Sequence, residues 1–288
     1  MPKHTARGQH RLNWRPDLPD ARDLRFANTQ TCKARAEDPK LLPTSVDLRP
    51  KCPPVVDQLS LGSCTSQALA GAMGFLELKE MAAAPTAVTA AGVAAVPPIL
   101  APEEFSSSAF AAFSRLQIYW NERVIEGDTD QDGGAQLRDG IKSLAASGAC
   151  SETTWPYVVE NAMTAPSEAA VAEAAKHKIS TYARLDNTQI NELKSCLALG
   201  YPFVFGFSVY SNFQSDETAA TGVLTMPGHD DAPDGGHAVL AVGYDDARQI
   251  FIVRNSWGSS WGAGGYFFMP FDYICNENLA DDFWVIRR

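Results

Sequence analysis

The chain has 288 residues, of which 45% are hydrophobic, and a formal net charge of −10 at pH 7. This length and apolar content indicate a globular protein with its own core. The negative charge argues against a protein that follows nucleic-acid phosphates, because such proteins gain affinity from Lys and Arg. The longest apolar run, residues 90–101, is too short to cross a bilayer. We expect a soluble monomer that binds neither nucleic acid nor membranes.

The first 43 residues differ in charge from the rest. They carry nine Lys/Arg against five Asp/Glu, whereas residues 44–288 carry fifteen against twenty-nine. Within this polar, proline-interrupted stretch, residues 14–26 include the aromatic anchors Trp14 and Phe26. The sequence predicts an extended N-terminal arm (1–43) that docks on the acidic body (44–288) near the cleft and restricts access to it. A disordered tail is the alternative.

The amino terminus has basic residues but lacks the apolar stretch of a secretory signal. A cytoplasmic location is therefore the default expectation, and export without a leader stays open.

Helical patterning dominates residues 44–160. After Ser63, a candidate helix cap, apolar residues recur at intervals of three and four, at Ala68, Leu69, Ala72, Met73 and Leu76, which predicts a helix ending near Met81. A low-complexity insert with four prolines, residues 82–104, is expected to form a surface loop. Helical patterning returns over residues 108–124 and 135–148.

Residues 161–288 have a different texture. Short segments rich in β-branched and aromatic residues, at 178–185, 202–210, 236–246, 249–257 and 264–270, are separated by Gly, Asp and Asn. They predict an antiparallel sheet or small barrel. A helical half followed by a β half indicates an α+β protein with two lobes and a cleft between them.

Six cysteines occur, without CxxC pairs or metal-site spacing: Cys32, Cys52, Cys64, Cys150, Cys196 and Cys275. Cys64 is placed at the predicted start of a helix, where unpaired N–H groups and the helix dipole favour a reactive thiolate. A single cysteine near a helix start is usually inert, so this position alone is weak support. If Cys64 is a free nucleophile, five cysteines remain and cannot all pair, which favours reduced thiols.

Two further segments supply partners for a thiol. His237 enters an alternating strand after Gly235 and Gly236, and is the one histidine of five that a rigid element would hold. Asn255 offers an amide that could bond an imidazole nitrogen, and Trp257 could shield that bond from water. Each feature alone is compatible with a purely structural role.

Taken together, QLSLGSCTSQALAGA, GGHAVLAVGYDD and RNSWGSSWG, in this order, resemble the papain-like cysteine peptidases, in particular their bacterial branch. The resemblance begins near Pro43, where PTSVDLRP looks like the start of a mature enzyme. It implies the papain-like two-lobed fold and a catalytic set of Cys64, His237, Asn255 and the oxyanion-binding Gln58. It also implies no cofactor and no metal.

The resemblance further implies how a polypeptide substrate is bound and cleaved. Gly133 and Gly134 match the paired glycines that hold substrate backbone, and Gly62, Gln136, Gly236 and Trp257 fall in or near the substrate-binding region. The implied reaction is hydrolysis through a Cys64 thioester, with endopeptidase action as the default. An arm shorter than the usual propeptide precedes the mature-like start, which raises the possibility of a zymogen.

Departures from the family pattern qualify these expectations. Leu61 and Gln131 stand where the family has a disulfide-bonded pair of cysteines, Thr65 replaces the usual tryptophan beside the nucleophile, and Gly236 replaces Asp or Asn. Packing around the thiol and the pH profile should therefore differ.

Three further functions stay open. Asp128, Asp130, Asp132 and Asp139 form an incomplete calcium-loop pattern, for which a solvated acidic turn is the simpler interpretation. The papain-like motifs are also compatible with a catalytically silent peptide-binding protein or with a transglutaminase-like acyltransferase.

Overall fold

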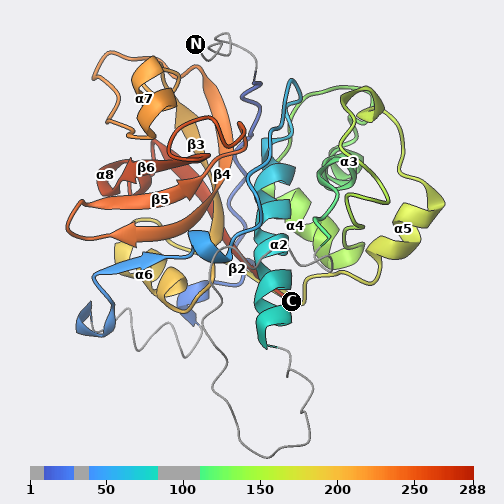
Figure 1. Cartoon of the computed structure of the whole chain (residues 1–288), viewed down its shortest axis with the longest axis horizontal. Coiled ribbons are helices and arrows are strands. Elements are labelled where there is room, and N and C mark those ends of the chain that lie inside the picture. The colour runs from blue at the N-terminus through green and yellow to red at the C-terminus, as the bar shows by residue number, and fades with distance from the viewer. Residues whose placement is uncertain (1–9, 29–38, 84–110) are drawn as a thin grey trace, which may run out of the picture.

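The computed structural model describes residues 10–28, 39–83 and 111–288, and these form two lobes (Figure 1). The α-helices are α2 (Cys64–Ala83), α3 (Arg115–Glu126), α4 (Leu137–Ala146), α5 (Glu168–Ala174), α6 (Ile190–Ala198), α7 (Asp216–Thr221) and α8 (Phe271–Ile274). The strands are β1 (Ser45–Asp47), β2 (Thr181–Arg184), β3 (Phe203–Val209), β4 (Gly235–Asp245), β5 (Ile250–Arg254), β6 (Tyr266–Pro270) and β7 (Ala280–Arg287). Most of the predicted insert, from residue 84 on, lies outside the described residues. In the described ranges no helix is long and apolar enough to span a membrane.

The helical lobe follows the predicted pattern with shifted ends. Helix α3 begins at Arg115, not at residue 108, because the Ser114 hydroxyl accepts the Gln117 N–H and caps the helix there. The hydroxyl of Ser63, expected to cap α2, instead contacts the Tyr157 hydroxyl at 2.6 Å and the Gln67 amide at 3.0 Å. Helix α2 nevertheless begins at Cys64, directly after Ser63.

The β lobe is one antiparallel sheet. Its strands follow the order β2-β7-β3-β4-β5-β6 within the described residues, and β1 pairs with β4. Four of these strands fall within the predicted segments and β4 begins one residue before its segment, whereas β1 and β7 were not predicted. The sequence expectation of an α+β protein with an antiparallel half is confirmed.

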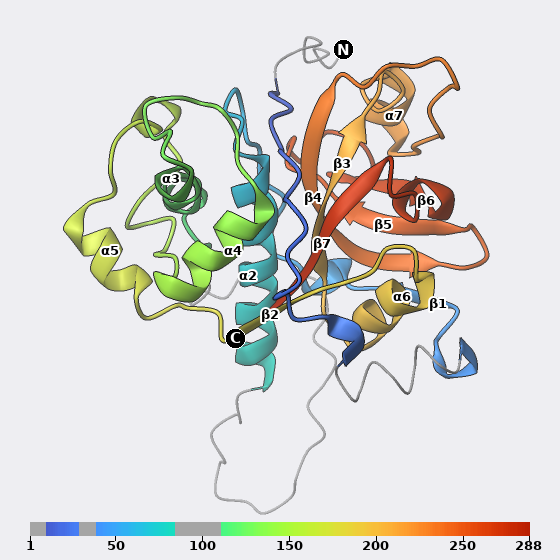
Figure 2. The ribbon, with the colours of Figure 1, turned by 180° about the vertical axis from the view of Figure 1, so that it is seen from behind.

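Residues 10–28 form a docked arm that runs between α2 and α4 on one side and β4 and β7 on the other (Figure 2). Asn13 forms a bridge to Gly236, and Trp14 forms one to Ala135. The Trp14 indole occupies space left by Gly206, where an added Cβ would lie 1.9 Å from the ring. Phe26 is fully buried. These described residues of the arm are therefore part of the core and not a loose tail.

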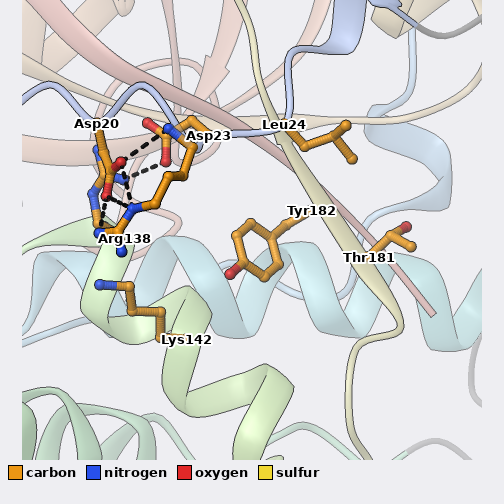
Figure 3. A pocket seen from close by; sticks show the side chains of 8 residues that line it. Asp20, Asp23, Leu24, Arg138, Lys142, Thr181 and Tyr182 are labelled. Atoms are coloured by element: carbon orange, nitrogen blue, oxygen red, sulfur yellow. Dashed lines mark hydrogen bonds and ion pairs between the residues drawn. The ribbon is translucent and has the colours of Figure 1, made fainter.

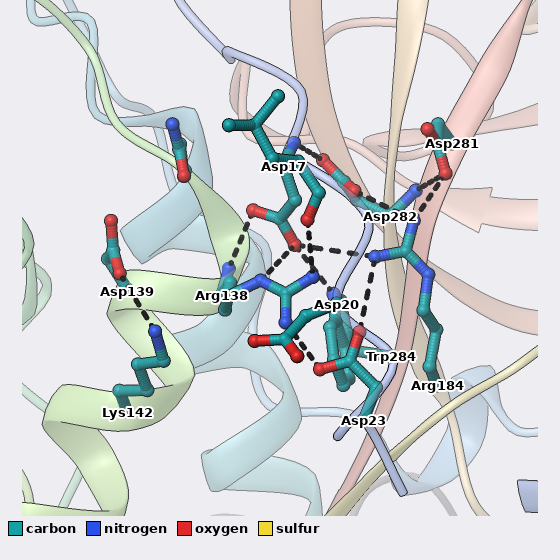
Figure 4. A network of polar contacts seen from close by, with 12 residues as sticks. Asp17, Asp20, Asp23, Arg138, Asp139, Lys142, Arg184, Asp281, Asp282 and Trp284 are labelled. Carbon is teal, nitrogen blue, oxygen red and sulfur yellow. Dashed lines mark hydrogen bonds and ion pairs between the residues drawn. The ribbon is translucent and has the colours of Figure 1, made fainter. Parts of the chain in front are cut away.

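A buried polar network anchors the middle of this arm (Figure 4). Four carboxylates surround two guanidiniums there, with Asp17, Asp23, Asp281 and Asp282 facing Arg138 and Arg184. The backbone N–H of Asp17 also donates to Asp282 at 2.8 Å, and Trp284 Nε1 donates to Asp17 at 3.2 Å. Burial raises the pKa of Asp17 against the opposing effect of the two arginines, and burial together with the neighbouring Asp17 carboxylate raises that of Asp282 to about 8.

We expect Asp282→Asn to flatten the dependence of stability on pH. A carboxyl with a raised pKa holds its proton in the folded protein up to about pH 8 but loses it near about pH 4 when unfolded. The contribution of Asp282 to the free energy of unfolding is therefore greatest below about pH 4. It falls as pH rises from about 4 to about 8, by at most about 1.4 kcal/mol per pH unit. Asparagine suits the left-handed backbone at this position, where φ is 59°.

Urea unfolding from about pH 5 to about pH 8 measures this slope. The control is Asp20→Asn, because hydrogen bonds from Arg22 lower the pKa of Asp20 and keep it ionised throughout that range. Equal slopes for wild type and Asp282→Asn would show that the cluster holds no such proton.

Candidate active site

The first candidate group is the thiol of Cys64, which begins helix α2 and is fully buried. Its sulfur accepts backbone hydrogen bonds from Ala238, Asn13 and Thr65. Ala238 directly follows His237, so packing of the two lobes brings the thiol to the segment that carries the candidate histidine. All described cysteines are free, which leaves the Cys64 sulfur unbonded.

The second group is the imidazole of His237, near the start of β4. Its Nε2 lies 2.8 Å from Asn255 Oδ1, which also accepts the Ser256 backbone N–H at 2.8 Å. Because that oxygen is an acceptor, Nε2 carries the hydrogen. The Nδ1 atom is buried and has no hydrogen-bond partner among the described residues. This tautomer leaves Nδ1 for proton exchange with another group.

Aromatic rings enclose the bond between His237 and Asn255. The Trp257 ring lies with its centroid 5.3 Å from that of His237, and Phe213 lies 6.0 Å away on the same measure. A dry surrounding strengthens an amide-imidazole hydrogen bond. The position of Trp257 agrees with the shielding expected from the sequence.

Burial sets the protonation of the thiol and the imidazole. Desolvation raises the pKa of Cys64 to about 11 and lowers that of His237 to about 4, so both are neutral at pH 7. The expectation that the helix start would lower the pKa of an accessible Cys64 thiol is wrong for this state. The helix dipole adds only a modest stabilisation, whereas complete exclusion of water penalises the thiolate more.

The arm contributes to the cover of this site. Gln58, which is buried, donates from Nε2 to the Arg11 carbonyl at 3.1 Å and to the Leu61 carbonyl at 3.0 Å. Ser256 Oγ donates to Gln58 Oε1 at 2.7 Å and fixes the direction of the amide. An arm carbonyl therefore already occupies the donor predicted to bind an oxyanion.

Three glycines predicted to bind substrate lie against the same arm. An added Cβ would lie 2.6 Å from the Asn13 amide at Gly62 and 1.8 Å from the Asn13 carbonyl at Gly134. The Gly236 carbonyl accepts the Trp14 N–H at 3.0 Å. These positions admit a peptide backbone because they have no side chain.

The remaining predicted residues lie at the rim of this region. The His10 ring of the arm stacks on Trp257 with centroids 4.9 Å apart, and Gly133 lies beside Asp128. Gln136 precedes helix α4, and its backbone N–H donates to Glu126. Gln136 is thus held by the helical lobe, where its side chain makes no hydrogen bond to the described part of the arm.

Sequence reasoning missed a buried carboxyl behind the nucleophile. Thr65, which stands in place of the family's tryptophan, donates from Oγ1 to Glu122 Oε2 at 2.8 Å. Glu122 is fully buried, and burial raises its pKa well above the usual range, which favours the neutral carboxyl. Gly140 leaves the room, since an added Cβ would lie 2.4 Å from Glu122 Oε1. The only sequence signal was the unusual Thr65.

No group of three or more His, Cys, Asp or Glu side chains in the described ranges is placed to hold a metal ion. Of the residues in the calcium-like pattern, Asp128 and Asp132 instead face the arm's arginines. A pocket of about 560 Å³ lies where the arm meets α4 and β2 (Figure 3). Its lining residues, Asp20, Arg22, Asp23, Leu24, Arg138, Lys142, Thr181 and Tyr182, include none of the predicted site residues.

Comparisons with known proteins identify the family. A family model described as papain family cysteine protease matches residues 123–280. The uncharacterized peptidase C1-like protein L477 of Acanthamoeba polyphaga mimivirus is 38% identical over 287 residues, covering 94% of this chain and 84% of that protein. Cathepsin B-like CP3 of Giardia intestinalis is 29% identical over 55% of this chain and 54% of its own length.

Solved structures give the same result. Xylellain, a cysteine protease from Xylella fastidiosa, superposes with a TM-score of 0.79 at 37% identity and covers 98% of both chains. The two-lobed α+β fold expected from the sequence is thereby confirmed. The chain belongs to the papain family of cysteine proteases.

Proposed function

We propose that this protein is an endopeptidase that attacks peptide carbonyls with Cys64 and that its N-terminal arm holds it inactive. In the reaction the Cys64 thiolate adds to the carbonyl, and protonated His237 gives its proton to the leaving amine. The resulting thioester on Cys64 is hydrolysed by water that His237 deprotonates, which releases the acid and restores the thiol. Asn255 orients the imidazole throughout.

One observation carries the catalytic part of the proposal. The free thiol of Cys64 lies against the backbone that follows His237, whose Nε2 is bonded to Asn255 and whose Nδ1 has no partner within the described residues. A thiol beside an imidazole that is oriented by a third group is the arrangement that activates a cysteine nucleophile. Gln58 Nε2 and the Cys64 backbone N–H would then face the developing oxyanion.

The docked arm supports the inhibitory part. It brings a carbonyl to Gln58, a backbone N–H to Cys64 and a ring onto Trp257, so a substrate must displace it. Its cover also keeps the thiol and imidazole neutral. Water that enters when the arm leaves would lower the pKa of Cys64 and raise that of His237, which favours the reactive ion pair.

Labelling by an epoxysuccinyl thiol-peptidase inhibitor tests the nucleophile. We expect stoichiometric modification at Cys64 by peptide mapping and its loss in His237→Ala, because the imidazole is needed to form the thiolate. Cys64→Ala should keep the wild-type fold by circular dichroism while losing turnover of a peptide substrate.

Three different results would redirect the assignment. Modification at another cysteine would contradict the assignment of Cys64. If no cysteine is modified, whether the arm is docked or loosened, a catalytically silent peptide-binding protein would be favoured. Amide products with added amines, in place of acid products, would favour acyl transfer over hydrolysis.

Loosening the N-terminal part of the docked arm tests inhibition in the full chain. His10 bonds Asp57 at 2.9 Å and Arg11 pairs with Asp132 at 3.0 Å, whereas Trp14 and Phe26 belong to the core. We expect His10→Ala combined with Arg11→Ala to raise the rate of Cys64 labelling about fivefold, since one part-buried hydrogen bond and one ion pair of an exposed arginine contribute about 1 kcal/mol together.

The control for this experiment is Arg22→Ala. Arg22 lies in the same arm but is exposed and pairs only with Asp20 among the described residues, away from Cys64. Its labelling rate should equal that of wild type. If the double variant also reacts at the wild-type rate, the arm does not limit access.

A further inference from the structure

The docked arm lies in the cleft as a short extended strand whose side chains alternate between the lobes. Arg11 and Arg15 reach acidic side chains of the helical lobe, while Leu12 and Trp14 pack at Gly235 and Gly206 of the sheet lobe. Successive side chains of an extended chain point to opposite sides. The side of the cleft formed by the helical lobe therefore contacts every second side chain of an extended peptide bound in this place.

At Arg15 this wall forms a site shaped for a guanidinium. Arg15 Nη2 bonds Glu126 Oε2, lies 3.5 Å from Asp128 Oδ2 and is 3.4 Å from the Gly134 carbonyl. The backbone N–H of Gln136 donates to Glu126 Oε1 at 2.7 Å and fixes this carboxylate. Three acceptors thus converge on one cationic group.

The position of the site in the fold strengthens its preference for a cation. Glu126 is the last residue of α3, where unpaired carbonyls add negative potential. Its side chain is only 8% exposed, although Arg15 itself is 44% exposed. Asp128 Oδ1 is buried and has no hydrogen-bond partner in the described ranges. Removing the guanidinium would leave a nearly buried carboxylate uncompensated, which is costly.

A peptide that displaces the arm meets this same site. Since Arg15 N–H donates to the Ala135 carbonyl at 3.1 Å, its side chain is set by backbone pairing along the predicted substrate-binding strip. An incoming peptide that pairs there places one side chain at Glu126. A neutral side chain would leave the carboxylates unpaired, and a basic side chain would restore the interaction.

From this geometry we propose that Glu126 and Asp128 form a specificity subsite for a basic residue of the substrate, with arginine preferred over lysine. Arginine is preferred because its planar fork reaches a carboxylate and a carbonyl at once. Arg11 and Asp132 form a second, weaker contact, since Arg11 is 57% exposed. The inference rests on the proposed peptidase function and adds its substrate class.

Paired peptides test the subsite in the full chain. A single arginine is moved through the four positions before the scissile bond of one peptide, and each is compared with citrulline, which keeps the shape but lacks the charge. We expect kcat/KM to favour arginine about tenfold at one position in wild type, the range of a charge-assisted hydrogen bond. In Glu126→Gln this ratio should approach one. The arm competes equally with both peptides, so its occupancy cancels.

Asp130→Asn is the matched control, because it removes an exposed carboxylate from the same loop without touching Arg15. Its arginine-to-citrulline ratio should equal that of wild type. A ratio near one at every position in wild type, or an unchanged ratio in Glu126→Gln, would overturn the subsite.

A second measurement needs no turnover. In full-length Cys64→Ala, hydrogen exchange at the Trp14 and Arg15 amides reports release of the arm, because both are bonded across the cleft. The arginine peptide should release them at about tenfold lower concentration than the citrulline peptide, and Glu126→Gln should remove the difference. If the arginine peptide releases the arm more readily but wild type cleaves neither peptide, the peptidase function is wrong and the subsite stands. If wild type cleaves the peptides but both release the arm at the same concentration, the subsite alone is wrong.

Discussion

The packing of helix α2 on strand β4 is the constraint on which the site depends. Cys64 begins the helix and His237 lies near the start of the strand, so neither lobe alone holds the pair. Gly71 lies at this contact, where an added Cβ would be in ordinary van der Waals contact with Arg254 and Leu240, both at 3.4 Å. Arg254 is buried and donates to the Pro53 carbonyl at 2.6 Å, which ties the segment before α2 to the sheet. Contacts between the two lobes that lie away from the reacting atoms therefore position the thiol and the imidazole.

In the proposed mechanism the arm acts on Cys64 and His237 by excluding water more than by direct charge. Covering the site moves the pKa values of Cys64 and His237 in opposite directions, and both shifts disfavour the ion pair. A single displacement would reverse both, so access and reactivity are coupled in the proposed mechanism. Glu122 lies behind Thr65 with a pKa that burial raises, and its ionised form would further oppose a thiolate at Cys64.

Features that depend on local sequence pattern were predicted, whereas features that depend on contacts with residues distant in the sequence were missed. The motifs placed Cys64 at the start of a helix and His237 near the start of a strand, as in the structure, and alternation located five strands. Strand β7 was missed because its acidic start, Asp281 and Asp282, resembles a loop until Arg184 compensates it. Charge asymmetry indicated a docked arm, but no local signal could show that Trp14 fills the space at Gly206. The expectation of a lowered Cys64 pKa was wrong because complete burial, which no local pattern shows, penalises the thiolate.

The arm can serve as a releasable inhibitor only if its contacts are graded along its length. An attached segment has a high effective concentration, roughly millimolar for short flexible linkers, so a free substrate competes poorly with one held tightly throughout. Here the strongest anchors, Asp17 and Phe26, lie beyond the site, whereas His10 and Arg11 at the reacting end make rim contacts. Release can therefore begin at Gln58 while the anchored part stays folded. Arg15 lies between these regions, so at the proposed subsite a substrate must replace the last of the arm's contacts with the cleft.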